Sequence, residues 1–207
     1  VRDGIAAVFA EGSSGEQALG QLEAALASTG NAAGLTSAQL LEMASQLRDG
    51  SMFSTEEIVA AQTRLLSYTD VAGKEFPRAM QIIIDQSQRL GVGVEQSAEI
   101  VGKALQSPAD AMTTLGRQGF KLADGQKQLI ERLMATGKTA EAQAIIMDML
   151  SEAYGGSAAA ARLGTAAGLW KTLQDTIGDF AGTVADSGSF EYVKTKLGEV
   201  NDAIKQM

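Results

Sequence analysis

The chain of 207 residues is long enough for one domain, or for one domain with an appendage. Its 17 Lys and Arg stand against 25 Asp and Glu, and the net charge of −8 disfavours binding to nucleic acid or to anionic lipid. It contains no His and no Cys, which excludes Cys and His zinc sites, His-dependent nucleophilic catalysis, iron–sulfur clusters and disulfides. We therefore expect a protein that is not an enzyme and that holds no cofactor or metal.

Helix start signals recur along the first part of the sequence. Thr36 to Gln39 and Ser54 to Glu57 both have the spacing of a capping box, in which two side chains bond reciprocally to backbone amides. Ser107 stands before Pro108, and proline is favoured at the first position of a helix. Each of these patterns predicts that a helix begins at the residue that follows.

Glycines stand where the apolar periodicity stops. A glycine after the last periodic residue can take the left-handed conformation that ends a helix without a steric cost. We expect this role at Gly30, Gly50, Gly73, Gly91, Gly137 and Gly155.

Between these signals, apolar residues recur at intervals of three and four, which is the period of an amphipathic helix, and alternating strand patterns are missing. The stripes at 129–134 and 145–150 flank a glycine and predict a helical hairpin. The fold class we predict is all-α, with a compact multi-helix domain of about seven to nine short helices. The residues expected to pack in its core are Leu65, Ile83, Ile84, Leu105, Leu129, Leu133, Ile146 and Met149.

The last quarter of the chain has a different pattern, so we place a boundary near Gly155-Gly156, with a compact domain at 1–155 and an extension at 156–207. From residue 163 to 184 the apolar spacing alternates three and four, as in a heptad seam, and it resumes after a hinge at 187–189. This predicts one or two longer helices whose seam must be covered by the compact domain, a second copy or a partner. The candidate interaction surface is Trp170, Leu173, Ile177, Phe180 and Val184.

Several other motifs are explained by helix structure without a functional role. Glu56, Glu57, Glu95 and Glu99 stand near predicted helix starts, where acids favour the helix dipole, so we do not assign them acid–base roles. The six bases between residues 103 and 138 predict a solvated face. Pairs of glycines four apart in the extension leave three interpretations open: packing within the chain, packing on a partner or second copy, and membrane contact.

Specific segments resemble a known family. Residues 30–36 read Gly-Asn-Ala-Ala-Gly-Leu-Thr, residues 102–108 read Gly-Lys-Ala-Leu-Gln-Ser-Pro, and a helical hairpin ends at Tyr154-Gly155-Gly156. Over residues 28–160 the chain resembles the N-terminal region of tail length tape measure proteins of long-tailed bacteriophages and prophages.

The resemblance implies a mechanical role. Such a protein occupies the lumen of the tail tube, sets tail length by its own length, and leaves ahead of the DNA. Its implied partners are the tail tube protein, tail assembly chaperones and tail tip proteins, with assembly in the bacterial host cytoplasm and a final location in the virion tail lumen. Self-association and membrane contact stay open, and direct nucleic-acid binding is not expected. The alternative is a generic helical scaffold or interaction domain of a bacterial assembly or secretion system.

Overall fold

A computed structural model describes residues 13–71, 75–117 and 124–164 of the chain. The residues in these ranges form helices joined by short turns, and no strand occurs among them. The all-α prediction is therefore confirmed. The helices are α2 (Ser13–Ser28), α3 (Ser37–Asp49), α4 (Thr55–Leu66), α5 (Glu75–Leu90), α6 (Val94–Gln106), α7 (Pro108–Arg117), α8 (Asp124–Ala135), α9 (Thr139–Tyr154) and α10 (Ser157–Gly164).

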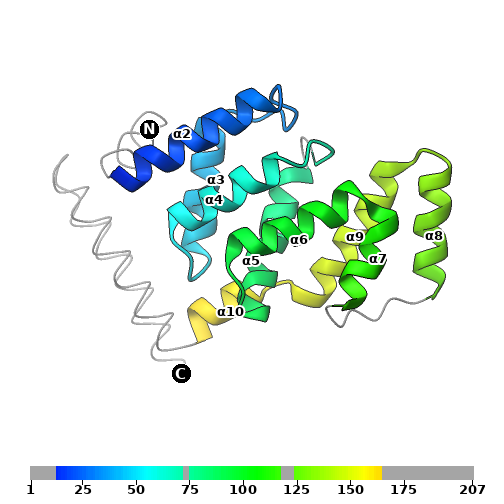
Figure 1. The fold of residues 1–207 in the computed structure, drawn as a ribbon. Helices are drawn as coiled ribbons and strands as arrows, with labels where there is room; N and C mark the ends of the chain where they lie inside the picture. The colour runs from blue at the N-terminus through cyan, green and yellow to red at the C-terminus, as the bar shows by residue number, and fades with distance from the viewer. Residues whose placement is uncertain (1–12, 72–74, 118–123, 165–207) are drawn as a thin grey trace.

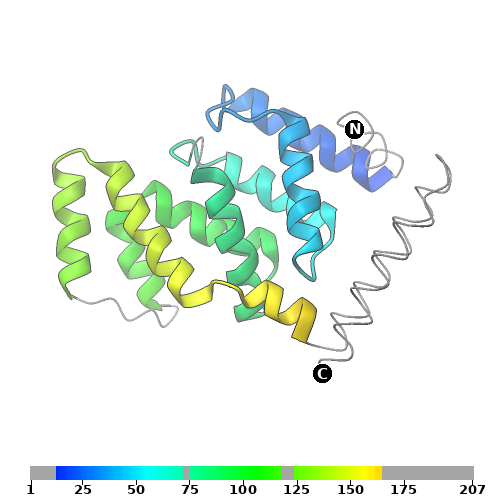
Figure 2. The same ribbon diagram turned by 180° about the vertical axis from the view of Figure 1, so that it is seen from behind.

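Helices α4, α5 and α6 form the middle of the molecule (Figure 1). Helices α2 and α3 pack against α4 on one side. On the other side α7 packs on α6, α9 packs on α5 and α6, and α8 packs on α7 and α9. Figure 2 shows the reverse face, where α9 and α10 run across α5. One continuous cluster of buried apolar side chains joins all these helices, from Leu22 in α2 to Ala158 in α10. The predicted hairpin is present, because α8 packs on α9.

The helix starts follow the predicted capping chemistry. The Ser54 hydroxyl accepts a bond from the backbone N–H of Glu57 at 3.2 Å, and the Ser54 N–H donates to the Glu57 carboxylate at 2.8 Å. Thr36 and Gln39 repeat this exchange at 3.2 and 2.9 Å. These bonds satisfy amides that have no partner within the helix, so both capping boxes are confirmed.

Three predicted glycine stops have the full left-handed geometry, and Gly91 is one of them, with the Val92 amide bonded back to the Ser87 carbonyl at 3.2 Å. Gly30 has a φ of 60° and Gly137 a φ of 72°. In each case the next amide bonds back across the turn, from Asn31 to the Leu26 carbonyl at 2.9 Å and from Lys138 to the Leu133 carbonyl at 2.8 Å. This pairing satisfies the last carbonyls of the helix and sends the chain back along it.

Helices α3 and α9 also end at Gly50 and Gly155 as predicted, but the left-handed conformation predicted there is wrong, since φ is −97° and −52°. At the end of α9 the left-handed residue is Gly156, with a φ of 77°, one position later than predicted. The apolar periodicity shows where a helix ends but does not specify which residue turns the chain. Gly91 has the expected positive φ, and Gly73 lies outside the described residues.

Most of the predicted core is buried, but Leu129 is not. Its exposed fraction is 47%, while its neighbour Ile130 is fully buried. Helix α8 lies at the edge of the bundle, and among the described helices it packs mainly on α7 and α9, so a narrower face than the sequence stripe is covered. Leu133 is partly buried for the same reason. The other predicted core residues are buried: Leu65, Ile83, Ile84, Leu105, Ile146 and Met149.

Helices α4 and α6 approach each other at a glycine. The ring of Tyr68, which follows α4, lies directly against Gly102, and a Cβ atom added at that glycine would overlap the ring. Gly102 is the first residue of the Gly-Lys-Ala-Leu-Gln-Ser-Pro segment. The glycine therefore has a steric role, because only a residue without a side chain admits the ring there.

Candidate functional site

The predicted interaction surface of Trp170, Leu173, Ile177, Phe180 and Val184 lies outside the described residues, as does the hinge at 187–189. The boundary near residue 155 stays a prediction. What the structure describes is α10, the helix that leads from the compact helices to this surface. Three residues, Asp85, Ala158 and Arg162, hold α10 through contacts with their partners, and these contacts are called the α10 joint.

The first turn of α10 is bonded to α5. The Asp85 carboxylate accepts a bond from the backbone N–H of Ala158 at 2.9 Å, and its other oxygen accepts one from the Gln81 amide at 3.1 Å. Asp85 is only 3% exposed and Ala158 is fully buried. A carboxylate at this position satisfies an amide that the helix leaves free and also favours the helix dipole. Asp85 thus caps a helix that lies 73 residues further along the chain.

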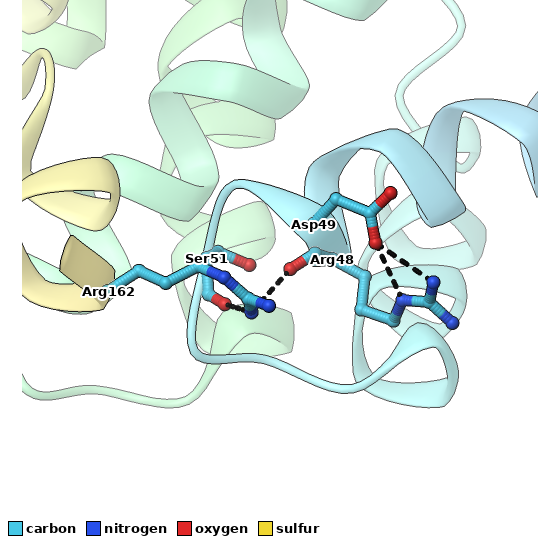
Figure 3. Close-up of polar contacts among 4 residues, drawn as sticks. All are labelled: Arg48, Asp49, Ser51 and Arg162. Carbon is cyan, nitrogen blue, oxygen red and sulfur yellow. Dashed lines mark hydrogen bonds and ion pairs between the residues drawn. The ribbon is translucent and has the colours of Figure 1, made fainter. Parts of the chain in front are cut away.

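The last turn of α10 is bonded to the turn between α3 and α4 (Figure 3). The Arg162 guanidinium donates to the backbone carbonyl of Arg48 at 3.0 Å and to that of Ser51. Arg162 is only 4% exposed, and Ser51 is fully buried. The two carbonyls lie at the C-terminal end of α3, where a cation is favourable. Arg48 itself bonds to Asp49 at 2.9 Å.

The α10 joint therefore holds both ends of one short helix. A side chain of α5 bonds to its first turn, and a side chain of its own last turn bonds to the α3–α4 turn. The role of these contacts is structural, because the carboxylate and the guanidinium each form hydrogen bonds to backbone groups. Sequence reasoning missed both residues. The signal at Asp85 was a charge placed directly after the apolar run Ile82 to Ile84, and the signal at Arg162 was a charge after four alanines. Neither position reveals its distant partner.

A second polar cluster joins α4 to α6. Glu99 bonds to Arg64 at 2.7 Å and to Lys103, one helical turn away. The hydrogen bonds from Lys103 and Arg64 lower the pKa of the Glu99 carboxyl, and Glu99 in turn raises the pKa of both bases. Glu99 is thus part of an ion-pair cluster on the α4–α6 surface rather than a lone acid.

Three of the six bases between residues 103 and 138 are exposed around α8. Lys127, Arg132 and Lys138 lie on the surface of α8 and of the turn after it, as expected for a solvated face. Within the described ranges, no group of three or more Asp and Glu is arranged to hold a metal ion. None of the helices in those ranges is both long enough and apolar enough to cross a membrane.

Comparison with known proteins identifies the family. The family model described as prophage tail length tape measure protein matches residues 3–131, which is more than half of the chain. No curated protein and no solved structure matches the chain. The matched segment ends inside α8, yet α9 packs on α5, α6, α7 and α8, so the folded unit continues past the match. The chain belongs to the prophage tail length tape measure protein family.

Proposed function

We propose that the described helices are a structural segment of a tape measure protein that contributes its length to the phage tail and acts without catalysis. The observation that carries the proposal is the family match over residues 3–131. The all-helical fold supports it, because a ruler built from α-helix has a defined length per residue. Family membership makes the chain a structural component concerned with phage tail length.

The proposal requires two arrangements of the same chain. As one continuous helix the 207 residues would span about 310 Å, whereas the described helices fold back on one another. Pro77 and Pro108 both lie within the first turn of their helices, so neither interrupts a helix interior. The turns at Gly30 and Gly137 use a conformation that glycine can exchange for a helical one. We propose a compact form in the free chain and an extended form under confinement.

The location and partners belong to the same proposal. We place the extended chain in the lumen of the tail tube before DNA ejection, with the tail tube protein around it and tail tip proteins at one end. Tail assembly chaperones would bind it in the host cytoplasm. Family membership is what supports these assignments.

The test is a tail-length measurement in the parent phage. Deletion of residues 13–164 in frame should shorten the tails seen by electron microscopy by up to about 230 Å, the length of those residues as helix. The matched control is Gly102→Ala, which disturbs the compact fold but keeps the number of residues, and its tails should have normal length. Tails of unchanged length in the deletion phage would contradict the proposal.

A further inference from the structure

We infer that α10 detaches from the compact helices as a unit, so that residues 157–164 leave α5 and the α3–α4 turn while α2 to α9 stay folded. The inference rests on the contacts of the α10 joint alone. It also deepens the proposed function, because release of α10 would be the first step from the compact to the extended form.

Helix α10 is short, and most of its side chains are small. It has eight residues, fewer than an isolated helix needs to be stable, and it packs mainly on α5. The side chains in its first half are those of serine and alanine, and only Ala158 among these is fully buried. Helix α9 differs in each respect, since it has sixteen residues, packs on four helices and buries Ile146 and Leu150. Among the described side chains of α10, Ala158 is therefore the one apolar side chain that is fully buried.

The groups that hold α10 are ones that water can replace. The Asp85 carboxylate and the Arg162 guanidinium are both buried. Asp85 of α5 bonds to the backbone of α10, and Arg162 of α10 bonds to the backbone at the end of α3. When α10 leaves, both charges and the carbonyls of Arg48 and Ser51 become accessible to water, so no charge is left buried without a partner. A joint built from such groups opens more readily than an apolar one.

The chain has a hinge at the place where such a motion requires one. Tyr154, the last residue of α9, is buried in the common core, so the end of α9 is fixed. Gly155 and Gly156 follow, and Gly156 has a φ of 77°, a conformation that an L side chain rarely adopts. The glycine pair therefore lies between a buried residue that stays in the core and a short helix that can move away from it.

Thiol labelling of the full chain tests the inference, because the natural sequence has no cysteine. The probe variant is Ala158→Cys, in α10, and the matched control is Ala98→Cys, in α6; both alanines are fully buried. Under native conditions we expect a thiol reagent to modify the cysteine at position 158 at least about tenfold faster than the one at 98, which reports global opening. Equal rates that rise together in urea would overturn the inference.

Three further substitutions in the Ala158→Cys chain show that the joint sets the rate. Asp85→Ala and Arg162→Ala should each speed labelling at position 158 about tenfold, without changing labelling at 98 in the control chain. Asp85→Asn keeps an acceptor oxygen for the Ala158 amide and should restore part of the slow rate. Circular dichroism of every variant shows whether α2 to α9 stay folded. If these substitutions speed labelling at both positions equally, α10 is an integral part of the core and the inference fails. The tail-length result does not enter this test.

Discussion

The packing of α4 on α6 and the α10 joint are two different ways of holding a helix in one protein. Between α4 and α6 the buried contact is apolar and close, with the Tyr68 ring against the backbone at Gly102, and the ion pair of Arg64 with Glu99 lies at its surface. At the α10 joint the contacts are bonds from Asp85 and Arg162 to backbone groups. Burial of one large apolar side chain is worth about 1.5–3 kcal/mol, and a hydrogen bond to a charged group contributes a similar net of about 1.5–3 kcal/mol, so the two kinds of contact are comparable one by one. The α4–α6 contact is part of the common core, whereas the α10 joint attaches one short helix through a few polar groups.

The largest expected effect is the difference in stability lost when a leucine is shortened in the core helix α4 and in the edge helix α8. Leu65→Ala in α4 removes a fully buried side chain and should lower the free energy of unfolding by about 2–5 kcal/mol. Leu129→Ala in α8 is the matched control, because the same side chain is half exposed there, and it should change stability by less than about 0.5 kcal/mol. Urea unfolding measures both, and similar losses would show that α8 is packed more tightly than its exposure indicates.

The next effect tests the close approach itself. Gly102→Ala adds a Cβ atom that overlaps the Tyr68 ring, so we expect a loss of about 1–3 kcal/mol, as for other overpacked cores. Tyr68→Leu in the same chain should recover part of that loss, because a smaller side chain vacates the space. The double-mutant cycle measures the coupling. Strictly additive losses would mean that the ring does not limit substitution at this glycine.

A smaller effect is expected when α10 is removed. A chain of residues 1–156 should unfold cooperatively and be less stable than a chain of residues 1–164 by about 1–2 kcal/mol, since it lacks mainly the bonds at Asp85 and Arg162. Thermal unfolding of the two chains provides the comparison. If the shorter chain fails to fold, α10 belongs to the core and the boundary near residue 155 is misplaced.

The smallest effect concerns the ion-pair cluster between α4 and α6. The folded-state pKa of Glu99 is lowered, so its stabilising contribution is fully present above the unfolded pKa of about 4.3 and is lost as the pH falls through the folded pKa. The raised pKa values of Arg64 and Lys103 add stability that is lost only in strong base. Stability should therefore be nearly constant between about pH 6 and 8. Glu99→Gln should differ from the natural chain at neutral pH and converge with it in acid, as unfolding midpoints would show.

The sequence was informative wherever a feature depends on neighbouring residues. The capping boxes at Thr36 and Ser54 were predictable because both partners lie within one helical turn. The burial of Ile83 and Ile146 was predictable because each lies at the centre of an apolar stripe. The prediction for Leu129 was wrong because periodicity shows which face of a helix is apolar, but not how much of that face a neighbour covers.

The amino-acid sequence by itself determined the all-α class, the starts of several helices and most of the buried positions, since these follow from periodicity, capping and side-chain size. Tertiary structure alone decided the α10 joint and the Tyr68–Gly102 contact. Asp85 and Ala158 are 73 residues apart, and Arg162 lies 111 residues from Ser51. A charge in an apolar segment shows that some partner is needed, but only the folded chain brings that partner within bonding distance.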